Sequence, residues 1–189
     1  SIPALARQGA IAGWLGTAAR APGLAIIFLV GLGLLPALLV TSAGLGTRLL
    51  VGANRVSVST AIGCYAFSLV PMGFGMWLAH YAFHFLTGSL TIVPVVQSFL
   101  ADIGLFGSRV QWGLGPLVPT EWLYPIEAVL LYCGATGSLI AAFQIARIQL
   151  GDRDPGARQA VLRAALPWAL LVLLMRAAGL WILVQPMEM

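Results

Sequence analysis

The sequence predicts an all-α integral membrane protein, a bundle of about four transmembrane helices with one or two interfacial helices. Of the 189 residues, 60% are hydrophobic and only 8% are charged, whereas roughly 25% of the residues of a soluble domain are charged. Four apolar stretches reach the roughly 20 residues that a helix needs to cross the hydrocarbon core of a bilayer. Because nothing between them has the composition of a soluble domain, we expect residues 1–189 to form a single transmembrane helical domain.

The elements follow from the positions of these apolar runs. Residues 4–19 are compatible with a helix but are short and weakly apolar, which indicates an interfacial helix. Residues 88–121 are too long and too apolar for a simple exposed loop, so we expect a short surface helix over 92–103, followed by Gly and Pro turns. The four expected spans cover about 23–45, 60–87, 122–147 and 162–185.

The second span contains Pro71, Gly73 and Gly75. Proline bends a helix, and glycine lets a neighbouring helix approach closely. Either effect would open room beside the histidines that follow.

The distribution of arginine predicts the orientation of the bundle. All ten basic residues are arginine, and the segment 88–121 holds only Arg109. Arginine-rich loops face the cytoplasm in membrane proteins, so we place both termini and the segment 88–121 outside, although Arg7 and Arg20 then also lie on the outer side. We expect a multi-pass protein of the bacterial inner (cytoplasmic) membrane, with lipid and no nucleic acid as a partner. The links assigned to the cytoplasm contain Arg48, Arg55, Arg147, Arg153, Arg158 and Arg163.

The cysteines Cys64 and Cys133 are far apart, and both lie inside apolar segments. Neither has a second cysteine at a spacing that binds a cluster. We therefore expect no iron–sulfur cluster or zinc site on this chain, and two buried thiols without a disulfide.

Ionisable side chains inside the spans mark the candidate site. His80 and His84, the two histidines, lie one helical turn apart. At 1.5 Å per residue, His80 lies roughly 10 to 12 Å inside the outer end of its span, Glu127 about 8 Å and Arg176 about 13 Å. Charged residues inside spans usually pair in the bundle interior. We expect Glu127 and Arg176 to be partners or to share a site next to His80; the alternative is a structural ion pair with hydrogen-bonded core histidines.

A quinone headgroup suits these residues best. Its carbonyl oxygens accept hydrogen bonds from histidine or arginine, and oxidation of the quinol needs a proton acceptor, a role that we assign to Glu127 as the catalytic residue. Aromatic side chains on the same span can form flat apolar walls. The expected cofactor-binding residues are His80, His84, Arg176, Trp77 and Tyr81.

A b-type haem is an alternative cofactor. Because His80 and His84 point the same way from one helix, they cannot bind opposite faces of one iron. The chain has no third histidine, so the second axial ligand would be a methionine, or would come from another subunit.

A metal ion is the other alternative. The HxxxH spacing suits a metal on one helical face, but Tyr81 stands where the zincins carry glutamate. Met72, Met76, His80 and His84 recur every four residues, which suits a copper path. Such a stripe is also typical of core packing.

Residues 71–98, "PMGFGMWLAHYAFHFLTGSLTIVPVVQS", and the closing "QPMEM" resemble the membrane-embedded part of bacterial membrane-bound iron–sulfur proteins of the FesM type. These are ferredoxin-like proteins anchored in the membrane and implicated in quinone-linked electron transfer. The clustered cysteines of that family are absent here, so the resemblance implies that any cluster lies on a missing part of the chain or on a partner.

The expected function combines this resemblance with the candidate site. We expect an accessory membrane subunit of a respiratory or photosynthetic oxidoreductase complex, which anchors an iron–sulfur or cytochrome subunit and contributes a quinone or haem b site near the outer face. The alternatives are a metal (copper-like) transport or delivery protein and a purely structural membrane subunit.

Overall fold

The computed structural model describes residues 20–52, 54–105, 107, 109–151 and 156–185, and all regular structure within them is helical. The interfacial helix expected over residues 4–19 lies outside this part of the chain. In chain order the helices are α2 (Arg20–Phe28), the π-helical η1 (Leu29–Leu34), α3 (Leu35–Val51), α4 (Val58–Tyr65), the 3-10 turn η2 (Ala66–Leu69), α5 (Val70–Gly88), η3 (Ser89–Thr91), α6 (Ile92–Asp102), η4 (Thr120–Trp122), α7 (Leu123–Leu150) and α8 (Ala157–Val184).

Four helical segments of the described chain are long and apolar enough to cross a membrane. The first ends at Val51, six residues beyond the predicted end at 45. The helix continues because leucine and valine follow Arg48. The long apolar stem of an arginine is compatible with the end of a span. The helix predicted over 92–103 is confirmed as α6, and its position at a membrane surface stays a prediction. The four segments are Gly23–Val51, Val58–Asp102, Thr120–Leu150 and Ala157–Val184.

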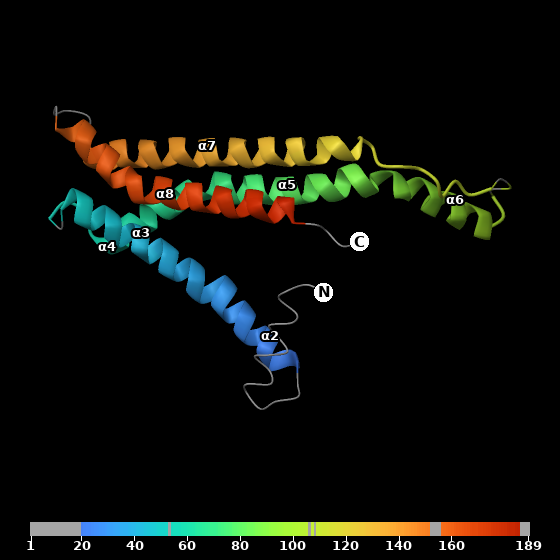
Figure 1. The fold of residues 1–189 in the computed structure, drawn as a ribbon, viewed down its shortest axis with the longest axis horizontal. Coiled ribbons are helices and arrows are strands. Elements are labelled where there is room, and N and C mark those ends of the chain that lie inside the picture. The colour runs from blue at the N-terminus through green and yellow to red at the C-terminus, as the bar shows by residue number, and fades with distance from the viewer. Residues whose placement is uncertain (1–19, 53, 106, 108, 152–155, 186–189) are drawn as a thin grey trace.

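The long helices form an open bundle (Figure 1). α5, α7 and α8 run side by side, α3 packs against one end of α8, and α2 diverges from the others. α6 extends beyond the far end of α5. Only 6% of the first segment's most apolar window is buried, against 33% for the third. The interior of the bundle is therefore built mainly by α5, α7 and α8.

A polar contact fastens α3 to α8. The indole Nε1 of Trp168 donates a hydrogen bond to Thr47 Oγ1 over 3.0 Å, and the Thr47 hydroxyl donates to the carbonyl oxygen of Ala164 over 3.1 Å. Tyr65, at the end of α4, stacks on the Trp168 ring with the centroids 5.5 Å apart. These side chains are fully buried, so one cluster joins three helices.

α5 and α7 meet along a seam of small residues. The predicted close approach at Gly75 is confirmed, since this glycine packs directly on the backbone of Gly134 in α7. Nearby, the backbone N–H of Met72 donates to Ser138 Oγ over 2.8 Å. Because Met72 lies in the first turn of α5, where backbone N–H groups have no partner within the helix, Ser138 caps α5 from the neighbouring helix.

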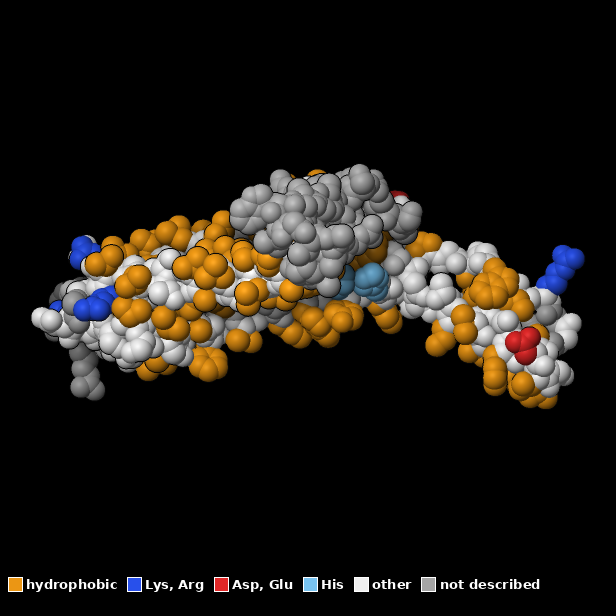
Figure 2. All heavy atoms as spheres, turned by 90° about the horizontal axis from the view of Figure 1, so that it is seen from below, with side chains coloured by type: hydrophobic (Ala, Val, Ile, Leu, Met, Phe, Trp, Pro, Cys, Tyr) orange, Lys and Arg blue, Asp and Glu red, His pale blue; other side chains and the backbone are white. Residues whose placement is uncertain are grey.

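The links that carry arginine lie at one end of the bundle. The end of α3 and the start of α4 lie there, as do the end of α7 and the start of α8 (Figure 1), and Figure 2 shows basic side chains at that end as well as at the opposite end. The histidines lie farther along the molecule. That this end faces the cytoplasm stays a prediction.

Cys64 and Cys133 are both free and exposed. The prediction that they are buried is therefore wrong. The inward-facing residues beside them are Tyr65 and Gly134, so the helical repeat turns each cysteine outward. An open bundle has a small interior, and an apolar residue in it faces outward as readily as inward.

Candidate functional site

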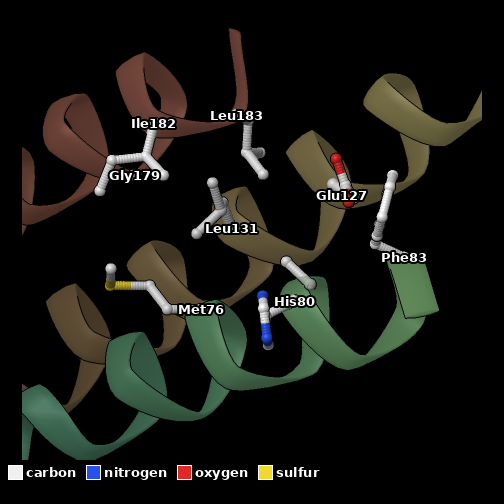
Figure 3. Close-up of a pocket in the computed structure, with 9 residues that line it drawn as sticks. Met76, His80, Phe83, Glu127, Leu131, Gly179, Ile182 and Leu183 are labelled. Carbon is white, nitrogen blue, oxygen red and sulfur yellow. The ribbon is translucent and has the colours of Figure 1, made fainter. Parts of the chain in front are cut away.

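A pocket of about 170 Å³ lies between α5, α7 and the end of α8 (Figure 3). Its wall is apolar except for one imidazole and one carboxylate. These two groups come from different helices, His80 from α5 and Glu127 from α7. The lining residues are Met76, Ala79, His80, Phe83, Glu127, Leu131, Gly179, Ile182 and Leu183.

Glu127 is the buried polar group of this pocket. It shares the inward face of α7 with Leu131 and Gly134, at spacings of four and three residues that keep side chains on one side of a helix. Only 3% of Glu127 is exposed, and its buried Oε1 atom has no hydrogen-bond partner among the residues that the structure describes. An unsatisfied buried oxygen is destabilising, which is why this carboxylate is a candidate for binding a ligand.

His80 lines the pocket, and His84 does not. The two imidazole rings stand almost at right angles, at 83°, with their centroids 4.7 Å apart. Both histidines are exposed at the side of the bundle. The structure therefore places one of the two predicted histidine ligands beside Glu127 and the other one turn away.

Arg176 does not share the pocket. α7 and α8 are antiparallel, with Leu131 against Gly179, so Arg176 lies about 10 Å along the bundle from the level of Glu127. Its guanidinium carbon instead lies 4.9 Å from the ring centroid of Tyr132, and its buried Nε has no hydrogen-bond partner within the described ranges. Within the described residues no ion pair joins Arg176 to Glu127, because the register of the two helices holds them apart.

Trp77 and Tyr81 lie on another face of α5. Their rings contact each other at a centroid distance of 4.5 Å, and they are 53% and 52% exposed. They do not line the pocket. The aromatic side chain that does so is Phe83.

Several pocket residues were not predicted from the sequence: Ala79 in α5, Leu131 in α7, and Gly179, Ile182 and Leu183 in α8. Gly179 follows two alanines, a run of small residues that signals close helix packing. Nothing in the sequence distinguishes three further lining residues from the other aliphatic residues of their helices: Leu131, Ile182 and Leu183. Only the tertiary packing marks them as lining residues.

The pocket fits a metal or a haem less well than an organic ring. The described residues contain no group of three His, Cys, Asp or Glu side chains that could hold a metal ion. Met72 is fully buried against the neighbouring helices, apart from the pocket. Met76, the nearest candidate for a second axial ligand, lies on the same helix as His80, so it cannot approach an iron from the opposite side.

No protein-family model, curated protein or solved structure matches the chain. Function is therefore argued from the geometry of the pocket.

Proposed function

We propose that the chain is an accessory subunit of a bacterial inner-membrane electron-transfer complex, and that its pocket binds the ring of a quinone or quinol. One observation carries the proposal: the buried Oε1 of Glu127 has no hydrogen-bond partner in the described part of the chain, and it lies in an apolar pocket that His80 also lines. The hydroxyl of a quinol would donate the hydrogen bond that this oxygen lacks.

The size of the pocket supports a single ring. An apolar cavity of about 150 Å³ accommodates benzene, and this pocket measures about 170 Å³. His80 and Ile182 are exposed at the side of the bundle, so the pocket faces the surface that lipid would cover. A lipid-soluble quinone could enter from the bilayer and leave its tail there.

The two polar groups suit the proton chemistry of a quinol. Oxidation breaks two O–H bonds and releases two protons and two electrons. Glu127 would accept one proton directly, and the His80 imidazole would accept the other. The electrons would pass to an iron–sulfur or haem centre of a partner subunit. This role agrees with the resemblance of residues 71–98 to FesM-type proteins.

The arginine-bearing links support an orientation in which the pocket lies in the outer half of the membrane. By the rule that basic loops stay in the cytoplasm, the end with Arg48 and Arg163 would face inward. His80, Glu127 and Leu183 lie toward the opposite ends of their helices. The quinone ring would then bind in the outer half of the membrane.

The two histidines supply a matched test. The purified chain in lipid nanodiscs would be titrated with short-chain ubiquinone and menaquinone analogues, with quenching of tryptophan fluorescence as the readout. His80→Ala should weaken binding about three- to tenfold, the value of one hydrogen bond, and His84→Ala should bind like the unmodified chain. If the two variants bind the quinone with equal affinity, whether normal or weakened, His80 is not the histidine that binds the ring.

A haem shared with a partner subunit is the second candidate. It is favoured by the exposure of the His80 imidazole at the side of the bundle, where another chain could supply the second axial ligand. A reduced-minus-oxidised visible spectrum of the native complex separates the two candidates. Loss of a b-haem band in His80→Ala would assign the haem, and an unchanged spectrum with weakened quinone binding would assign the quinone.

A further inference from the structure

A second pocket lies at the arginine-bearing end of the bundle, far from the first. It has a volume of about 220 Å³ and lies between the end of α3, the link that follows it and the start of α8. Arg55 from the link and Arg163 from α8 line it, together with Gln159. No carboxylate of the described residues lines this pocket. Two basic groups from separate elements therefore converge on one hollow.

The backbone adds to the positive character of this pocket. Gly156, the residue before α8, lines it and provides no side-chain hydrogen bond to the helix start. Within the described residues, this 28-residue helix therefore begins without a side-chain cap. Such groups, with the helix dipole behind them, attract anions. The guanidinium groups of Arg55 and Arg163 form no ion pair or hydrogen bond within the described part of the chain.

We propose that this pocket binds a phosphate group. Guanidinium groups bind phosphate through paired hydrogen bonds, and the free N–H groups of α8 can donate to the remaining oxygens. The source would be the headgroup of an anionic phospholipid or free phosphate. Leu50 and Val51 line the same pocket at the end of an apolar span, which favours the lipid. Basic pockets between helices at the cytoplasmic surface bind anionic headgroups.

The first test measures lipid retention. The full chain is purified with phosphatidylglycerol or phosphatidylcholine and examined by native mass spectrometry. The unmodified chain should retain phosphatidylglycerol preferentially, and each arginine removed should weaken retention about fivefold. The test variant is Arg55→Gln with Arg163→Gln. The control, Arg48→Gln with Arg158→Gln, removes the same charge from the same end without altering the pocket lining.

A second variant covers the case in which the double arginine variant fails to fold. Gln159→Glu puts a negative charge into the pocket, yet glutamate in the first turn of a helix is favourable. It should fold normally and lose lipid retention. Normal retention by Gln159→Glu, or equal losses in the test and control variants, would overturn the proposal.

Free phosphate is distinguished by a separate measurement. If phosphatidylglycerol is not retained preferentially, the thermal unfolding midpoint is measured with and without inorganic phosphate at constant ionic strength. A rise for the unmodified chain and the control, but not for Gln159→Glu, would assign the site to free phosphate. No preference for phosphatidylglycerol and no rise with phosphate would overturn the proposal. None of these readouts depends on the quinone pocket.

Discussion

Gly75 in α5 and Gly134 in α7 pack backbone against backbone. A Cβ atom built on Gly75 would lie 2.9 Å from the carbonyl oxygen of Leu130 and 3.0 Å from the Cα of Gly134. A Cβ atom on Gly134 would lie 2.8 Å from the carbonyl oxygen of Pro71. These contacts leave no space for a side chain. The pair therefore sets the distance between the helices that carry His80 and Glu127.

Gly75→Ala should force α5 and α7 apart. The neighbouring atoms are backbone, which cannot move aside as the end of a side chain can, so we expect a loss of about 1 to 3 kcal/mol in the free energy of unfolding. Thermal unfolding in detergent, followed by tryptophan fluorescence, measures it. Gly73→Ala is the control, because no atom lies within 4 Å of its added Cβ and alanine favours helix. Equal unfolding midpoints for the two variants would contradict the role given to the seam.

Thr47→Val should loosen α3 from α8. The substitution leaves the buried Trp168 indole N–H without its acceptor and removes the hydrogen bond to Ala164. An unsatisfied buried donor costs about 1 to 3 kcal/mol, which denaturant titration of the purified chain can resolve. Thr136→Val is the matched control, since the Thr136 hydroxyl is exposed and bonds only to the carbonyl of Tyr132 in its own helix. If both variants lose the same stability, the contact does not hold α3 in place.

Glu127→Gln tests the proton acceptor. Glutamine has nearly the same shape and can still accept a hydrogen bond, but it cannot take a proton from a quinol. In the native complex, quinol-dependent turnover should fall about 100-fold or more, while the amount of assembled complex stays normal. Glu121→Gln should be silent, because Glu121 is exposed and outside the pocket. Normal turnover in Glu127→Gln would remove this residue from the mechanism.

The exposed Cys133 reports whether lipid surrounds the bundle. Its thiol lies on the outside of α7, well inside a segment long enough to span a membrane. In a Cys64→Ala background, a charged maleimide should leave Cys133 unlabelled in intact membranes and label it after SDS denaturation. The control carries Asp102→Cys together with Cys64→Ala and Cys133→Ala. Its new thiol should be labelled without denaturation, because Asp102 is exposed at the end of α6. Rapid labelling of native Cys133 would place water at the middle of α7.

The sequence predicted the positions of the helices well. Each expected span corresponds to a described helical segment, and α6 lies where a surface helix was expected. Length and apolarity suffice for this, because a stretch of about 20 apolar residues has few alternatives to a helix. Gly75 also marked the close approach of a neighbouring helix correctly, since a side chain there would leave no room for the contact, whereas Gly73 has no atom within 4 Å of an added Cβ.

The candidate site was predicted only in part, and Arg176 shows why. Counting residues from the helix ends placed it near Glu127, but the register of α7 against α8 turns its guanidinium onto Tyr132. Trp77, Tyr81 and His84 were predicted from their types and stand outside the pocket. A count along one helix gives a depth and leaves open the direction in which a side chain points.

By itself, the sequence determined the helical class, the four apolar segments and the links that carry arginine. The tertiary structure alone decided which side chains meet: His80 with Glu127 in one pocket, Arg55 with Arg163 in another, and Cys133 on the outside. The physical reason is that these helices are apolar on nearly every face. In a soluble helix the polar stripe shows which face is outside. In a membrane, lipid and the protein interior are equally apolar, and in this bundle small residues such as Gly75 and Gly134 mark the inward face by their close packing.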